Sequence, residues 1–230
     1  QLFKYLGRVL SGDLGHSFYY DDTVAHLILN ALPTTLMLAM TALILAVLIG
    51  TLFGVYAAIK PQGLFSHFVT MFSLLGYATP VFWLGMIVLL VFALYLPWFP
   101  AYGIRSLPEP DTAFERVLDI INHLVLPVFT LAVLYLANYS RIARASMLDV
   151  LGADYIRTAR TKGMSEYVVI FKHALKNAAL PVVTLAGLQL GQVFSGAVLV
   201  ETVFSLPGVG PLLYESIVRR DYPVILGVLF

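Results

Sequence analysis

Between two long apolar runs, residues Arg141–Asn177 read RIARASMLDVLGADYIRTARTKGMSEYVVIFKHALKN. This polar segment holds seven of the fourteen basic residues of the chain: Arg141, Arg144, Arg157, Arg160, Lys162, Lys172 and Lys176. Basic loops between two membrane spans are retained in the cytoplasm. We therefore expect residues 141–177 to form a helical cytoplasmic loop on which a soluble protein docks.

The composition indicates an integral membrane protein. Hydrophobic residues make up 60% of the 230 residues, charged residues only 12%, and the mean hydropathy is +0.87. Soluble domains carry about 25% charged residues. A net charge of +1, with the basic residues gathered in one loop, argues against nucleic acid as a partner. Because the chain has no cysteine, a disulfide framework, a thiolate nucleophile and a cysteine metal site are excluded.

Uncharged runs of about 20 residues, which cross a hydrocarbon core about 30 Å thick, predict the membrane spans. The predicted fold class is an all-α polytopic transmembrane helix bundle, with one transmembrane domain over residues 1–230 and one tilted span, not two, in the uncharged run 61–104. The expected spans are 33–59, 68–96, 124–140, 178–200 and, cut short by the end of the sequence, 222–230.

The charges of the loops predict their sides of the membrane. Lys60 and the 141–177 loop hold eight basic and three acidic residues, whereas the rest of the chain holds six basic and ten acidic residues. By the positive-inside rule, the first group is cytoplasmic, and the amino-terminal segment and the loops 97–123 and 201–221 face outward. Since the sequence then starts outside, we expect a further span before Gln1.

The first predicted helix of the cytoplasmic loop begins at Asp154, a favourable N-cap, and stops at Gly163. Its apolar or small face consists of Ile156, Ala159 and Gly163. We expect this face to enter a groove of a partner protein, with Arg157, Arg160 and Lys162 near acidic groups at the rim.

A second helix of the loop is expected to be capped by Ser165. Its apolar stripe consists of Tyr167, Ile170, Phe171, Ala174 and Leu175. The alternative for the whole loop is a solvated basic segment that only sets the topology, which would explain its charges but not two capped helices with apolar faces. On the outer side, the capping-box spacing of Thr112 and Glu115 predicts a short amphipathic helix along the membrane surface.

Several motifs in a fixed order resemble one family over nearly the whole chain. They are GDLGHSF (12–18), GYATPVFWLGM (76–86), RASMLDVLGADYIRTARTKGMSEYVVIFKHALKNAALPVVTLAGLQLG (144–191), GAVLVETVFSLPGVGPLL (196–213) and RRDYPVILGV (219–228). The sequence is similar to the inner-membrane permease subunits of bacterial ABC importers for dipeptides, oligopeptides and nickel, and most similar to the first permease of the dipeptide system. In that family, the segment that corresponds to Asp154–Gly163, including Tyr155, is the coupling helix that docks on the cytosolic ATPase.

The resemblance implies the type I ABC importer permease fold and a location in the bacterial inner membrane. It also implies a homologous second permease, two ATPase subunits that carry ATP and Mg²⁺, and an extracytoplasmic substrate-binding protein. The chain would then bind no cofactor and catalyse no reaction itself. In agreement, the sequence has no GxxxxGK[ST], HExxH or GxSxG motif, and its five histidines are scattered singly.

The substrate is expected to be a peptide, with nickel or glutathione as alternatives for the same machinery. An ion-coupled secondary transporter is disfavoured because the four complete spans contain no Asp, Glu, Lys or Arg. A membrane-embedded hydrolase would need a nucleophile with a base, or a metal cluster, and the spans offer only isolated hydroxyls and His67.

Two sets of residues are predicted to serve the transport pathway. Gln189 and Gln192 share a helical face and would line the pathway together with Ser195 or Gly196 one turn on, although hydrogen bonds to a neighbouring helix are the alternative. Glu201 ends the fourth span, after which Phe204 and Leu206 are expected to pack into the bundle. The outer turn that follows is punctuated by Pro207, Gly208, Gly210 and Pro211. We expect this turn to lie near the pathway mouth and to meet the binding protein, the alternative being a plain connecting loop.

Overall fold

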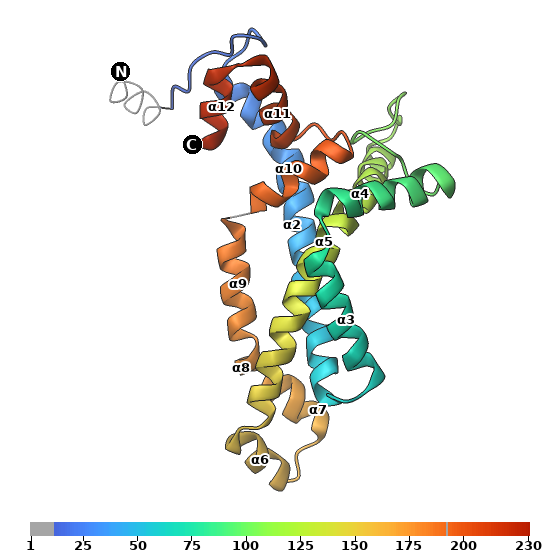
Figure 1. Cartoon of the computed structure of the whole chain (residues 1–230), viewed down its shortest axis with the longest axis vertical. Coiled ribbons are helices and arrows are strands. Elements are labelled where there is room, and N and C mark those ends of the chain that lie inside the picture. Colours follow the sequence, from blue (N-terminus) through green and yellow to red (C-terminus); the bar gives the residue numbers. More distant parts are fainter. Residues whose placement is uncertain (1–11, 192) are drawn as a thin grey trace. The chain divides into compact units, whose positions relative to one another are not determined.

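The structure, a computed structural model, describes residues 12–191 and 193–230, and the side chains of residues 193–196 lie outside this description. The regular elements of the described part are all helices, apart from an isolated β-bridge between His16 and Thr23. The elements are α2 (Val24–Ile59), α3 (Leu64–Ala78), α4 (Val81–Leu89), the π-helical η1 (Leu90–Tyr95), α5 (Ala113–Leu151), α6 (Asp154–Thr161), α7 (Glu166–Val168), the π-helical η2 (Val169–Ala174), α8 (Leu175–Ala178), α9 (Leu180–Leu190), α10 (Val193–Val203), α11 (Val209–Arg219) and α12 (Tyr222–Leu229) (Figure 1).

The chain divides into two compact units. Unit 1 comprises the described residues within Gln1–Ala39, Gly85–Pro127 and Phe194–Phe230, and unit 2 those within Met40–Leu84 and Val128–Val193. Among the described helices, α2 and α5 are long and apolar enough to cross a membrane, and two bent helix pairs raise the number of spans to four if each pair is one span. At 1.5 Å per residue, α2 is about 54 Å long, which exceeds the hydrocarbon thickness.

In unit 2, α5 packs closely against both α2 and α3. A Cβ atom at Gly54 would lie 2.6 Å from the Cβ of Ala143, and one at Gly76 would lie 2.6 Å from the Cβ of Ala137, so only glycine permits these approaches. Between α3 and α5, the hydroxyl groups of Ser73 and Ser140 are 3.0 Å apart. Small residues and paired polar groups therefore hold these helices together.

The predicted span 68–96 is not one continuous helix. Helix α3 ends at Ala78, Thr79 is extended, and α4 begins after Pro80 with a sharp bend. Proline has no backbone N–H and disfavours the helical conformation in the residue before it, which accounts for the break.

The predicted span 178–200 is also divided, because α9 ends at Leu190 and α10 begins at Val193. The predicted span 124–140 lies within a longer helix. Helix α5 runs without interruption from Ala113 to Leu151 and includes the stretch that we expected to be a separate surface helix. Its capping box is confirmed, because Thr112 Oγ1 accepts the Glu115 N–H and Glu115 Oε2 accepts the Thr112 N–H.

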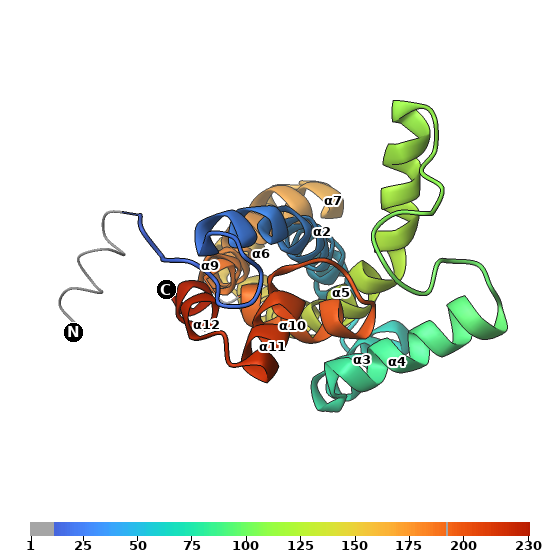
Figure 2. The same cartoon turned by 90° about the horizontal axis from the view of Figure 1, so that it is seen from above.

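In unit 1, the loop before α2 is fastened to the corner between α11 and α12 (Figure 2). The buried Asp221 carboxylate accepts hydrogen bonds from the Ser17 hydroxyl and from the backbone N–H groups of Phe18 and Tyr19, the latter two at 3.1 and 3.3 Å. The guanidinium of Arg219 lies 3.7 Å from the ring centre of Tyr19. One buried carboxylate thus organises both a loop and a helix corner.

Candidate functional site

The start of α6 differs from the prediction. Ala153, with φ −72° and ψ 149°, is the N-cap residue, and Asp154 is the first residue of the helix. The Asp154 side chain is 98% exposed and lies 3.7 Å from Arg157. Asp154 is therefore not the cap, although its negative charge in the first turn favours the helix through the dipole.

The end of α6 agrees with the prediction. Gly163 has φ +75°, in the left-handed region where glycine is favoured, and its N–H donates to the carbonyl oxygen of Arg160 at 3.0 Å. The helix therefore stops at this glycine.

The inner face of α6 is packed against the chain itself. Ile156 is fully buried and Ala159 is 7% exposed. Both belong to a hydrophobic group, which we name the corner cluster, that consists of Val55, Ala58, Met147, Ile156, Ala159, Val169, Ile170, Ala174 and Ala178. The expectation that Ile156 and Ala159 enter a groove of a partner is therefore wrong. A helix of eight residues is unstable alone, and the ends of α2 and α5 with η2 supply the packing that it needs.

The outer face of α6 is polar and accessible. Its exposed residues are Asp154, Tyr155, Arg157, Thr158, Arg160, Thr161 and Lys162. Tyr155 is fixed by a hydrogen bond of 2.8 Å from Asn177 to its phenol oxygen. Arg157 makes only a long contact with Asp154. Arg157 and Lys162 therefore carry the positive charge of this face that is available to an external partner.

Arg160 connects α6 to the helix that follows it. Its guanidinium donates two hydrogen bonds to the Glu166 carboxylate, at 2.6 and 3.2 Å. This hydrogen-bonded pair lowers the pKa of Glu166 and raises that of Arg160. Ser165 is the N-cap residue of α7, as predicted, without a side-chain capping bond. Of the predicted second stripe, Ile170 and Ala174 are buried, whereas Tyr167 is 72% exposed.

Of the predicted pathway residues, only Gln189 can be placed. Its Oε1 accepts a hydrogen bond of 3.2 Å from the Tyr139 hydroxyl, which joins α9 to α5 within unit 2. This is the contact with a neighbouring helix that we considered as the alternative. Gln192 and the side chain of Ser195 lie outside the described residues. The pathway role of these three residues stays a prediction.

The outer turn is held by the Glu201 carboxyl group, for which the sequence predicts only the end of a span. Glu201 lies inside α10, is fully buried, and its Oε2 accepts the Gly210 N–H at 2.8 Å. A Cβ atom at Gly208 would overlap the Glu201 carboxyl group. The prediction that Phe204 and Leu206 pack inward is confirmed, since each is 1% exposed.

The turn does not lead into an irregular loop. It leads into α11, whose first residue, Val209, is only 8% exposed and donates its N–H to Thr35 Oγ1 at 2.9 Å. The exposed large hydrophobic residues of α11 are Tyr214, Ile217 and Val218. Glu201 precedes Gly210 by nine residues, and no local sequence pattern predicts the hydrogen bond between them.

No group of three or more His, Asp or Glu side chains in the described part of the chain could hold a metal ion.

A family model described as "Binding-protein-dependent transport system inner membrane component" matches residues 50–230. The chain belongs to this family. It is therefore an inner-membrane component of a binding-protein-dependent transport system. The matched range contains α6, the corner cluster and the outer turn.

Several transport permeases are similar over nearly the whole chain. The di/tripeptide transport system permease protein DppB of Pseudomonas aeruginosa is 43% identical, over 98% of this chain and 71% of its own length. The oligopeptide transport system permease protein AppB of Bacillus subtilis is 44% identical, over 99% of this chain and 71% of its own length. The dipeptide transport system permease protein DppB of Escherichia coli is 39% identical, over 99% and 72%.

A solved structure supports the fold. The crystal structure of an amino acid ABC transporter with histidines matches with a TM-score of 0.58 and 16% identity, over 98% of this chain and 88% of that chain. At this identity the likeness concerns the fold alone, which is that of an ABC transporter permease.

Proposed function

We propose that this chain forms half of the translocation pathway of an ATP-driven importer of peptides. A substrate-binding protein delivers the peptide from the outside, a homologous permease forms the other half, and two separate ATPase subunits hydrolyse ATP. The observation that carries the proposal is the identity of 43% and 44%, over almost the entire chain, to permeases named for di/tripeptides and oligopeptides. The chain itself binds no cofactor, since ATP and Mg²⁺ stay on the ATPase subunits.

The contact with the ATPase is assigned to residues 154–163. Its recognition surface is the exposed face with Tyr155, Arg157 and Lys162, because Ile156 and Ala159 are used to attach α6 to the rest of unit 2. The corner cluster includes residues of α2 and α5, which are the two single helices in the described part of the chain that are long enough to span a membrane. A displacement of α6 would therefore be transmitted to these helices by direct packing, without any chemical step on this chain.

The proposal is tested by uptake into vesicles that contain the full complex. A labelled dipeptide should accumulate only when both the binding protein and ATP are present, and uptake should stop when hydrolysis is blocked. Arg157→Glu should reduce both uptake and ATPase association, more strongly at low than at high salt, because exposed charges act through screened attraction. Uptake driven by an ion gradient without ATP would contradict the proposal. Uptake of a nickel chelate or glutathione, but not of peptides, would contradict the assignment of the substrate.

A further inference from the structure

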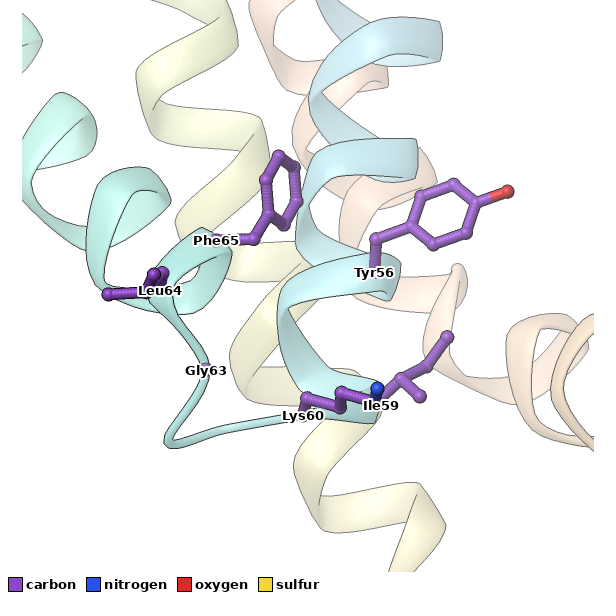
Figure 3. Close-up of a pocket in the computed structure, with 6 residues that line it drawn as sticks. All are labelled: Tyr56, Ile59, Lys60, Gly63, Leu64 and Phe65. Atoms are coloured by element: carbon purple, nitrogen blue, oxygen red, sulfur yellow. The ribbon is translucent and has the colours of Figure 1, made fainter.

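A pocket of about 510 Å³ lies beside the loop that joins α2 to α3 in unit 2. Its lining residues are Tyr56, Ile59, Lys60, Gly63, Leu64 and Phe65 (Figure 3). Tyr56 and Ile59 come from the last turn of α2, and Leu64 and Phe65 begin α3. The pocket is therefore open at the place where the chain turns between two apolar helices.

The aromatic walls of the pocket are held in place by rings outside it. Phe65 packs edge-on against Phe53, with 5.6 Å between ring centres, and Tyr56 packs against Phe171 at 6.1 Å. Nevertheless, Tyr56 and Phe65 remain 52% and 42% exposed, and Leu64 is 92% exposed. The pocket thus presents preformed apolar surface that other described residues leave uncovered.

Lys60 supplies the charge of the pocket. It is exposed and takes part in no ion pair or side-chain hydrogen bond with another described residue. Arg144 differs, because its Nε donates to Ser66 Oγ at 3.0 Å, and both residues line a different pocket. The pocket therefore combines apolar walls with one free ammonium group at its end.

The position of the pocket identifies the chemistry of its occupant. Lys60 belongs to the basic, cytoplasmic group of loops, so the pocket lies at the cytoplasmic boundary of the membrane. Lipids of that leaflet include anionic ones, which attract basic residues at the surface. We propose that this pocket binds an anionic phospholipid, with its phosphate at Lys60 and its acyl chains against Tyr56, Leu64 and Phe65. This site is independent of the substrate that the transporter carries.

The test measures which lipid occupies the pocket in the assembled complex. A fluorophore is attached to Leu64→Cys, which is the only cysteine of this chain because the native sequence has none; the partner subunits are cysteine-free. The complex is placed in phosphatidylcholine vesicles in which an equal mole fraction of either phosphatidylglycerol or phosphatidylcholine carries brominated chains that quench the fluorophore. Phosphatidylglycerol should bind about fivefold better than phosphatidylcholine, the ratio expected for one cationic residue at an anionic surface.

Substitutions of lysine give the controls. The preference should fall to about one in Lys60→Gln and persist in Lys60→Arg, which keeps the charge. It should also persist in Lys176→Gln, which removes another exposed basic residue of the cytoplasmic group. Equal quenching by the two lipids with Lys60 present would overturn the proposal, as would a preference that survives Lys60→Gln. Failure of both lipids to quench would show that a protein surface fills the pocket, which would overturn it as well.

Discussion

The buried Glu201 explains why glycine occupies positions 208 and 210. At Gly208, any side chain would overlap the carboxyl group, and at Gly210 a Cβ atom would lie 2.6 Å from the Cα of Val198 and 2.8 Å from Glu201 Oε2. A carboxyl group in a buried position needs hydrogen bonds to offset its lost hydration. The N–H of Gly210 supplies one of them, and the absence of a side chain is what lets the backbone come this close.

Glu201→Ala should therefore lower the stability of the protein by about 1–3 kcal/mol, because it leaves a buried N–H without an acceptor and opens a void. Gly208→Ala should also destabilise, by forcing the carboxyl group aside. The effects should be less than additive in the double variant, since removal of the carboxyl group makes room for the methyl group. Melting temperatures of the purified protein measure all three, with the exposed Glu215→Ala as the control. Strict additivity would mean that the two positions do not share this contact.

Asp221 has an equivalent role at the start of α12. It accepts two backbone N–H groups, of Phe18 and Tyr19, from a segment about 200 residues away in the sequence. Asp221→Ala should release these groups, so their hydrogen exchange should become faster by at least tenfold, which corresponds to about 1.4 kcal/mol of lost protection. Exchange measured by mass spectrometry on the peptide that contains residues 17–20 reports the change. Asp13→Ala in the same loop should leave the exchange of Phe18 and Tyr19 as it was.

At the scale of elements, α6 has two faces with different tasks. Ala159 is buried in the corner cluster, whereas its neighbour Thr158 is exposed. Ala159→Trp should overpack the cluster and destabilise this chain by about 1–3 kcal/mol even when the ATPase is absent. Thr158→Trp should leave the melting temperature unchanged but weaken ATPase association. Thermal unfolding of the permease alone and co-purification with the ATPase separate the two effects. Loss of association in Ala159→Trp without any loss of stability would contradict the packing described for α6.

Local chemistry sufficed to predict some element boundaries but not the partners of their faces. The capping box of Thr112 and Glu115 and the stop at Gly163 depend on residues close in sequence, and both were predictable. The burial of Ile156 within its own chain was not predictable, because the apolar face of an amphipathic helix can pack equally well against a partner protein or against residues of the same chain such as Val55. Uninterrupted hydropathy likewise concealed the break after Ala78, for which Pro80 was the only local signal.

For the whole molecule, the protein class and the family could be predicted from the sequence, but the contacts between distant segments could not. The high hydropathy predicted a helical membrane protein, and the order of the motifs predicted its family. The division into two compact units was not visible, because α2, α4 and α5 each contribute residues to both units. A continuous helix carries no break in sequence where one unit ends and the other begins. Contacts between distant segments, such as that of Asp221 with the 17–19 loop, define the units instead.

The orientation of the molecule in the membrane can be tested with two exposed positions. Leu107, in the acidic group of loops, is 91% exposed, and Thr161 is exposed at the end of α6 in the basic group. Basic loops are retained in the cytoplasm. A membrane-impermeant maleimide should therefore label Leu107→Cys in spheroplasts, whose inner membrane is intact. It should label Thr161→Cys only after this membrane is permeabilised. The native chain contains no cysteine and gives no background of its own. Labelling of Thr161→Cys before permeabilisation would contradict the predicted topology. It would also contradict the placement of Lys60 at the cytoplasmic leaflet.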